Sequence, residues 1–573
     1  MTSMKLKQLF IALPTLLIVG CTQVHVLQHK AVFEDFVYQG NDEFYNQHPL
    51  QADDEFYNPI LPGWYSDPSI CADGKGNYFM VTSTFGYYPG VPLFHSTDML
   101  NWRQVGHILT RPEQLPLEGA SVSTGGIFAA SIFYNKYNDT YYMITTNMNR
   151  MMRGQNGNFI VKSKNPLSGE WSDPIWLDDM NGIDPSLFFD EDGKAYVVHC
   201  GMARNAKYPG CNQMIMHEYD VENDKVIVES ATVLAEGGAF PEDQPIALEG
   251  PHLYKWNGMY YLMCAEGGTE LGHSEVIFRS DDLHGKFVAW EKNPILTQRT
   301  LGNRADGVYC TGHADIVQDP QGGWWSVFLG TRRIDGEMEN LGRETFMMPV
   351  RWSDDGWPYM TQGDDQVPMV LKMPGAKRSQ EVTFGNFSVT DDFTSTKLAD
   401  YWVTARDAAT DKYSLTEQPG TLVLRCDTMT LCNNRGSAAY VGRRLQHHQF
   451  RATTRMYFHP EAGEWAGMVL LKNESLQYYL AVGAEGIQVQ KIGENDAYEV
   501  QASAPLTGAK DLTLCIEGTN KGKTFDFSYS TDGGRSWQML LAGVDADYLA
   551  THYSTSGSSS FTGTTVGMYA VKR

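Results

Sequence analysis

Basic residues are scarce in this sequence relative to acidic ones. Its 573 residues include 45 Lys and Arg against 68 Asp and Glu, which gives a formal net charge of −23 at pH 7. Contacts with the phosphates of nucleic acids or anionic lipids need clustered Lys and Arg. The composition therefore argues against nucleic acid or an anionic lipid surface as a partner, and it favours a neutral substrate.

Motifs for bound cofactors are also missing. The sequence has no P-loop, no dinucleotide-binding fingerprint, no serine elbow and no zinc motif. Its nine cysteines show no paired spacing typical of a metal site. We therefore expect a reaction that needs no cofactor, buried free cysteines and no disulfide framework.

Long hydrophobic runs are absent as well. The apolar run over residues 9–19 is too short to span a bilayer, and no other segment approaches that length. It follows two lysines and ends near Cys21, which predicts a lipoprotein signal peptide over residues 1–21. Lipidation of Cys21 would anchor an exported bacterial lipoprotein to a membrane, in the periplasm or at the cell surface. Residues 22–57 show no clear periodicity and are expected to form a linker.

What the sequence does contain is a short pattern that recurs. An acid, a proline and an apolar run follow one another in three places, and two further copies lack the acid. In every copy a turn and a second apolar run come next. The turns lie roughly 55 to 65 residues apart, a period typical of repeat architectures. The copies with an acid are Ser66-Asp67-Pro68-Ser69, Ile183-Asp184-Pro185-Ser186 and Glu249-Gly250-Pro251-His252.

Repeated all-β units of this size predict a five-bladed β-propeller over residues 58–380. The first strand of each blade lines the central channel, so we expect Asp67, Asp184 and Glu249 to face one another. Alternatively, each Asp-Pro or Glu-Gly-Pro is only turn chemistry, which Asp and Pro favour for local backbone reasons. The recurrence of an acid at one blade position favours a shared site.

A second domain follows a shift in composition near residues 376–386. Short alternating strands separated by turns continue to the last residue, which predicts a β-sandwich over residues 387–573. The expected fold class is therefore all-β throughout. Whether this sandwich binds sugar or only supports the propeller is left open by its sequence.

Three carboxylates on one channel are suited to glycoside hydrolysis. One carboxyl group stays protonated and donates to the leaving oxygen, and another stays ionised on the opposite side of the sugar. A third carboxylate near the acid raises the pKa of that acid by like-charge repulsion. The sequence alone does not decide between inversion and retention at the anomeric carbon.

Several motifs, taken in order, resemble those of the family 43 glycoside hydrolases. The resemblance is to the β-xylosidase and α-L-arabinofuranosidase branch, and it implies an inverting five-bladed propeller with a C-terminal concanavalin A-like jelly roll. The motifs are Tyr65-Ser66-Asp67-Pro68-Ser69, Thr82-Ser83-Thr84-Phe85, Gly182-Ile183-Asp184-Pro185-Ser186, Glu249-Gly250-Pro251-His252, Ala265-Glu266-Gly267-Gly268-Thr269, Thr311-Gly312-His313-Ala314 and Leu341-Gly342-Arg343-Glu344-Thr345.

The resemblance implies a role for each of the three acids. Asp67 would be the general base, Glu249 the general acid, and Asp184 the residue that modulates the pKa of Glu249. The extended stretch over residues 237–248 precedes the acid and is expected to alter the rim of the pocket.

Further residues are implied to bind the substrate. Arg343 would hold a sugar hydroxyl, and Phe85 would wall the pocket of the terminal sugar. His313 would hold water or a structural calcium ion in the channel, although no cofactor is required. Phe561 lies in a loop that, in this branch, closes the active site on one side. Phe128 stands where relatives usually carry Trp, so we expect a smaller stacking platform.

A pocket closed on one side favours the release of single terminal sugars. We therefore expect an exo-acting glycosidase that releases xylose or arabinose from xylan, arabinoxylan, arabinan or their oligosaccharides. Two alternatives remain at this point, an endo-arabinanase and a non-catalytic glycan-binding lipoprotein. The oligomeric state stays open.

Overall fold

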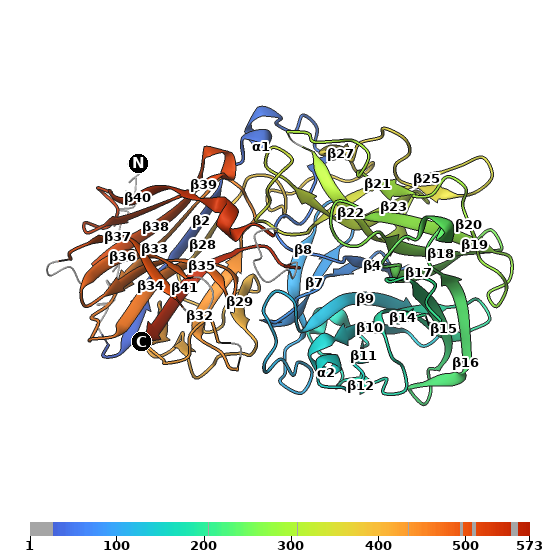
Figure 1. The fold of residues 1–573 in the computed structure, drawn as a ribbon, viewed down its shortest axis with the longest axis horizontal. Helices are drawn as coiled ribbons and strands as arrows, with labels where there is room; N and C mark the ends of the chain where they lie inside the picture. The colour runs from blue at the N-terminus through green and yellow to red at the C-terminus, as the bar shows by residue number, and fades with distance from the viewer. Residues whose placement is uncertain are drawn as a thin grey trace, which may run out of the picture.

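The computed structural model describes residues 27–573, except 204, 306, 434, 493–496, 507–510 and 552–559. The predicted signal peptide and Cys21 lie outside the described residues, so lipidation stays a prediction. The described chain forms a propeller and a sandwich that lie side by side (Figure 1). Nearly all of its regular structure is β-strand, which confirms the all-β prediction.

Five sheets form the blades of the propeller, and this confirms the predicted architecture. Their innermost strands contact one another in a closed ring around the channel. The strands are, blade by blade, β4 (Ser69–Ala72), β5 (Tyr78–Val81), β7 (Gly90–Ser96) and β8 (Arg103–Leu109); β9 (Ile127–Asn135), β10 (Thr140–Asn147), β11 (Asn158–Ser163) and β12 (Ile175–Trp176); β13 (Ile183–Phe189), β14 (Ala195–Met202), β15 (Asn212–Asp220) and β16 (Lys225–Glu236); β17 (Glu249–Trp256), β18 (Met259–Glu266), β19 (Ser274–Ser280), β20 (Val288–Ala289) and β21 (Leu296–Thr297); and β22 (Val308–Gln318), β23 (Trp324–Arg332) and β24 (Glu344–Pro349).

Short polar turns join the first two strands of a blade. In the first blade, the Asp73 carboxylate accepts the backbone N–H groups of Lys75 at 2.7 Å and Asn77 at 3.0 Å. This side-chain turn reverses the chain between β4 and β5. All four residues of β5 are buried, because neighbouring blades cover both faces of the sheet. The sequence pattern of turn and apolar run thus corresponds to one hairpin.

Helices and minor strands complete the chain outside the blades. The structure describes two α-helices of five residues each, and no described helix is long and apolar enough to cross a membrane. These elements are α1 (Glu43–Gln47), α2 (Met148–Met152), the 3-10 helices η1 (Pro166–Ser168), η2 (Pro241–Asp243), η4 (Asn520–Gly522) and η5 (Ala546–Leu549), the hairpin β25 (Arg351–Trp352) and β26 (Pro358–Tyr359), and the pair β3 (Glu55–Tyr57) and β27 (Val370–Lys372).

The second domain is a sandwich of two antiparallel sheets around one apolar core. The first sheet contains β30 (Tyr413–Ser414), β31 (Leu422–Arg425), β1 (Lys30–Phe33), β33 (Phe450–Tyr457), β38 (Asp511–Thr519), β39 (Thr524–Ser530) and β40 (Gln538–Asp545), with β2 (Phe36–Gly40) and β28 (Ser388–Asp391) beside them. The second contains β37 (Tyr498–Ala504), β36 (Gly486–Ile492), β35 (Leu476–Gly483), β34 (Glu464–Asn473), β41 (Thr565–Lys572), β32 (Ala439–Arg444), β29 (Trp402–Ala405) and β6 (Tyr87–Tyr88).

The prediction of a linker over residues 22–57 is wrong for its described part. Strand β1 pairs with β31 and β33, and β2 pairs with β28 and β33 of the sandwich. In Figure 1 these blue strands lie within the orange and red lobe. Phe33, Phe36 and Tyr38 are fully buried in the sandwich core. Strands β1 and β2 are therefore part of the sandwich. The chain forms these two sandwich strands before it enters the propeller.

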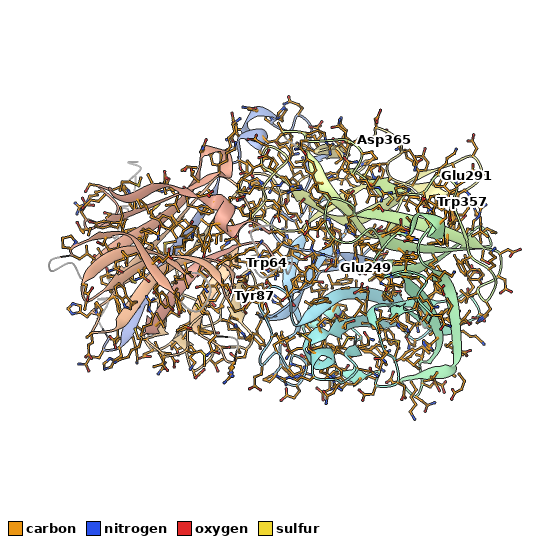
Figure 2. The ribbon with its side chains drawn as sticks, viewed as in Figure 1. Trp64, Tyr87, Glu249, Glu291, Trp357 and Asp365 are labelled. Atoms are coloured by element: carbon orange, nitrogen blue, oxygen red, sulfur yellow. The ribbon has the colours of Figure 1, made fainter. Side chains whose placement is uncertain are left out.

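The two domains share one apolar interface. Strand β6 leaves the first blade and pairs with β29 of the sandwich. Trp64 and Tyr87 are fully buried there and lie at the junction of the lobes (Figure 2). The guanidinium of Arg444, from the sandwich, lies 3.9 Å from the Trp64 ring and donates from Nε to the Trp64 carbonyl at 2.9 Å. The sandwich thus holds the loop that leads into Asp67.

The structure describes eight cysteines, and seven of them have free thiols: Cys71, Cys200, Cys211, Cys264, Cys310, Cys426 and Cys515. Six of the eight are buried, and burial raises the pKa of Cys71 and Cys264 well above the usual thiol value. Buried thiols of this kind behave as small apolar side chains.

Replacing one side chain of the N-terminal strands tests their place in the sandwich core. Phe33→Ala removes a fully buried ring, so we expect a loss of about 3–5 kcal/mol of stability in the sandwich. Gln39→Ala, on the exposed side of β2, serves as the control and should change stability by less than about 0.5 kcal/mol. The measurement is thermal and urea unfolding of both variants. Equal, small effects would mean that the segment is a linker after all.

Candidate active site

A cavity of about 270 Å³ lies at the mouth of the propeller channel. All eight described residues that were predicted as site residues line this cavity. Five further residues, which were not predicted as site residues, complete the lining. Figure 2 shows Glu249 in the middle of the propeller lobe. The eight are Asp67, Asp184, Glu249, Phe85, Phe128, Arg343, His313 and Phe561, and the five are Ala129, Ile183, Ala247, Gly268 and Thr269.

Backbone kinks aim these side chains at the cavity. In or just before each innermost strand, a residue beside the cavity has a left-handed φ: Asp67 (53°), Ala129 (40°), Asp184 (53°), Gly250 (58°) and His313 (52°). The strand pairing slips beside the last four, which marks a β-bulge in each of those blades. A bulge turns a side chain out of the regular alternation of a strand. A left-handed φ is unfavourable for most residues other than glycine, and residues that adopt it cluster at functional sites.

The three acids do not occupy one equivalent position, which corrects the sequence-based expectation. Asp67 and Asp184 are the kinked residues of their blades, whereas in the fourth blade the kinked residue is Gly250 and the acid precedes it. A Cβ atom at Gly250 would lie 3.0 Å from the ring of His313. Because no side chain fits comfortably there, the fourth blade presents its carboxylate from the preceding residue, Glu249.

Asp67 is held in its ionised form. Arg343 Nη1 donates to Asp67 Oδ1 at 3.1 Å, and His313 Nδ1 lies 3.9 Å from the same oxygen. Burial by itself raises the pKa of Asp67, but the Arg343 guanidinium beside it, helped by further hydrogen bonding, lowers the pKa below the usual carboxyl value. Burial also lowers the pKa of His313 to about 4, so this imidazole is neutral near pH 7.

Glu249 and Asp184 have the opposite electrostatic character. Burial, followed by the charge of Asp67, raises the pKa of Glu249 to about 7. Burial and the charges of Glu249 and Asp67 raise the pKa of Asp184 well above the usual value. The Gly250 N–H donates to Asp184 Oδ2 at 3.3 Å, which favours the ionised form of Asp184. Because the pKa values of both acids are raised and the charge of Glu249 acts on Asp184, the pair holds a shared proton near neutral pH.

Three phenylalanine rings form one wall of the cavity. Phe85 and Phe561 lie 6.0 Å apart and nearly parallel, and Phe128 meets them edge-on at 5.3 Å and 5.5 Å. An aromatic wall offers the apolar face on which a sugar ring can pack. Because Phe128 also contacts the other two rings, it belongs to this wall rather than standing alone as a platform.

Phe561 comes from the sandwich, and several groups fix its segment in place. Thr562 forms a β-bridge with Gly342, and the carbonyl oxygen of Thr562 accepts from the fully buried Lys472 ammonium at 2.7 Å. The Phe561 carbonyl accepts from Arg343 Nε and Nη2 at 3.4 Å. The same guanidinium thus contacts Asp67 and the wall contributed by the second domain.

His313 was also predicted as a possible calcium ligand. Calcium prefers six to eight oxygen ligands, whereas His313 offers one nitrogen. Within the described residues, the one cluster of three metal-ligating side chains is His29, Glu461 and Glu464 on the sandwich, and His313 is not part of it. A calcium ion in the channel stays a prediction, and no step below depends on it.

Sequence reasoning missed the role of Thr269. Its hydroxyl accepts from Arg343 Nη1 at 3.0 Å, so it helps to fix the guanidinium that faces Asp67. Thr269 closes the motif Ala265–Thr269, but nothing in the pattern distinguishes its hydroxyl. Ala247 lies in the cavity wall, as expected if the stretch over residues 237–248 shapes the rim.

Removing the ring of Phe561 tests whether the sandwich contributes to the site. Phe561→Ala opens the aromatic wall, so we expect kcat/KM to fall by about 10-fold, mainly through KM, with unfolding unchanged. Val500→Ala, on an exposed strand of the same domain, is the control and should retain wild-type kinetics. A Phe561→Ala enzyme with an unchanged KM would show that the second domain does not touch the substrate.

Comparison with known proteins agrees with this geometry. Residues 56–358 match the model of glycosyl hydrolases family 43, and residues 390–573 match that of the β-xylosidase C-terminal concanavalin A-like domain. A xylosidase/arabinosidase of Butyrivibrio fibrisolvens is 38% identical over 90% of this chain and 95% of its own. A non-reducing end α-L-arabinofuranosidase of Bacteroides ovatus is 34% identical over 91% and 92%.

A solved structure extends the similarity to the whole fold. The crystal structure of a GH43_12 protein from a capybara gut metagenome has a TM-score of 0.86 and 38% identity, and it covers 94% of this chain and 99% of its own. The two family models together cover most of both lobes, although β1 and β2 of the sandwich lie outside the matched ranges. The chain is therefore a glycosidase that belongs to family 43 of the glycosyl hydrolases.

Proposed function

We propose that the protein is an exo-acting, inverting glycosidase that releases terminal xylose or arabinose from plant polysaccharides or their oligosaccharides. The observation that carries this proposal is the opposite electrostatic state of two carboxyl groups in one cavity. Asp67 has a pKa below the usual value because Arg343 lies beside it, and burial raises the pKa of Glu249 to about 7. An ionised base and a protonated acid on either side of a sugar are what hydrolysis requires.

The proposed reaction assigns one task to each acid. Asp67 takes a proton from a water molecule that attacks the anomeric carbon, and Glu249 gives its proton to the leaving oxygen. Asp184 shares a proton with Glu249, and its negative charge, when that proton lies on Glu249, keeps it there until the bond breaks. Arg343, held by Thr269 and Phe561, keeps Asp67 ionised and faces the hydroxyl groups of the bound sugar.

The shape of the cavity supports release of terminal sugars. Phe561 and its neighbours close one side, and residues such as Ala247 and Gly268 form part of the rim. A chain that continued in both directions would need an open groove, so an endo-arabinanase is less well supported. The names of the relatives given above include both xylosidase and arabinofuranosidase activities, and we propose that one or both belong to this protein.

Hydrolysis of an aryl β-xyloside and an aryl α-L-arabinofuranoside, together with internal cutting of arabinan, tests this proposal. We expect single sugars from one or both aryl glycosides and no internal cuts. Release of internal fragments from arabinan would favour the endo-acting alternative, and binding of oligosaccharides without hydrolysis would favour a non-catalytic role.

Substitution of Glu249 tests the role of the acid. Glu249→Gln should lower kcat/KM by about 10²-fold or more on xylo- or arabino-oligosaccharides, because a poor leaving group needs a proton. Activity on glycosides of activated phenols should fall much less, since such groups leave without protonation.

Asp67→Asn is the matched comparison, because loss of the base should affect both kinds of substrate alike, by about 10²-fold or more. The measurement is kcat/KM for both variants on both substrates. Equal losses for Glu249→Gln on the oligosaccharide and the activated glycoside would contradict its assignment as the acid.

A further inference from the structure

Ser83 is a buried residue beside the catalytic cavity to which the reaction above gives no role. It follows β5 by two positions and is fully buried. Its Oγ lies 2.5 Å from Asp67 Oδ2, and the backbone N–H of Ala129 donates to the same Oγ at 2.7 Å. Its own backbone N–H donates to the Ser66 carbonyl at 3.0 Å, which fixes the serine against the segment that carries Asp67.

The Ala129 amide determines where the hydroxyl proton of Ser83 points. A backbone amide can only donate, so it occupies a lone pair of Oγ and leaves the hydroxyl proton for another acceptor. The acceptor within reach is the Asp67 carboxylate. A hydrogen bond from a hydroxyl to an ionised carboxylate is short and roughly twice as strong as one between neutral groups. The 2.5 Å separation fits that description.

This contact completes the support of Asp67. Arg343 donates to Oδ1 and Ser83 donates to Oδ2, so each oxygen of the carboxylate is held by a different group. Holding both oxygens fixes the plane of the carboxylate toward the cavity. It also explains why the second blade keeps a left-handed kink although it carries no acid, because the kinked residue, Ala129, supplies the amide that orients Ser83.

We propose that Ser83 is a positioning residue for the general base, which keeps Asp67 ionised and aimed at the attacking water. This inference rests on the proposed role of Asp67. The other titratable and charged groups that face Asp67 are Arg343, His313, His273, Asp184 and Glu249. Ser83→Ala leaves all of them in place and removes one hydrogen bond that favours the ionised carboxylate.

Ser66→Ala is a matched control within the same segment. Ser66 is also fully buried, and its hydroxyl has no hydrogen-bond partner among the residues that the structure describes. Both substitutions delete one buried oxygen next to Asp67, but only the Ser83 substitution removes a contact with it. A general effect of altered packing would therefore appear in both variants, and a specific effect only in Ser83→Ala.

The first measurement is the pH profile of kcat/KM on the aryl glycosides. Ser83→Ala should lower the value at the optimum by about 10-fold and move the acidic limb upward by about one pH unit, because the pKa of Asp67 rises. The basic limb, set by Glu249, should stay in place. Ser66→Ala should show the wild-type profile. An acidic limb that does not move in Ser83→Ala, or that moves equally in Ser66→Ala, would overturn the proposal.

The second measurement does not depend on activity. A carboxyl whose folded pKa is depressed adds stability above its unfolded pKa, and this stability is lost as the pH falls through the folded pKa. The difference in unfolding temperature between wild type and Ser83→Ala should therefore be largest near pH 7 and shrink below about pH 4. A difference independent of pH would overturn the proposed contact with the ionised form. If the wild type hydrolysed neither glycoside, the proposed function would fail while this comparison still reported on Ser83.

Discussion

A left-handed kink in or just before every innermost strand is the constraint on which the site depends. A regular strand would send its side chains alternately into one blade face and the other, and the acids would be buried between sheets. At Asp67 and Asp184 the kink turns a carboxylate into the channel mouth instead. At Ala129 it presents a backbone amide, and at Gly250 it makes room for His313 and leaves the acid to Glu249. One repeated backbone feature thus serves different functions in different blades.

Burial acts alike on the three carboxyl groups of the cavity, yet their pKa values end on opposite sides of the usual value. It raises the pKa of each, but Asp67 alone receives a direct hydrogen bond from the Arg343 guanidinium, so its pKa ends below the usual value while those of Glu249 and Asp184 end above it. The separation of base from acid therefore depends on the placement of one cation. The sandwich takes part in that placement, because Arg343 also donates to the carbonyl of Phe561.

Local patterns in the sequence predicted the parts of the structure that local physics determines. Polar turns followed by apolar runs indicate hairpins. The repetition of this pattern predicted five blades and, from them, that the three acids lie close together. The place of β1 and β2 in the sandwich could not be predicted this way, because Lys30 pairs with Arg425, almost 400 residues along the chain. The offset of Glu249 depends on the space beside His313, and the contacts of Ser83 and Thr269 depend on groups from other segments. A local pattern in the sequence does not show which distant segments come into contact.

The most direct test of the account is the pH dependence of kcat/KM in Asp184→Asn. Glu249 must be protonated to act as the acid, so activity should fall as the pH rises through its pKa, which burial and Asp67 raise to about 7. Asp184→Asn removes a like charge that faces Glu249, so the basic limb should move downward by about one pH unit. The acidic limb, set by Asp67, should stay nearly in place. A basic limb that did not move, or that moved upward, would contradict a proton shared between Asp184 and Glu249.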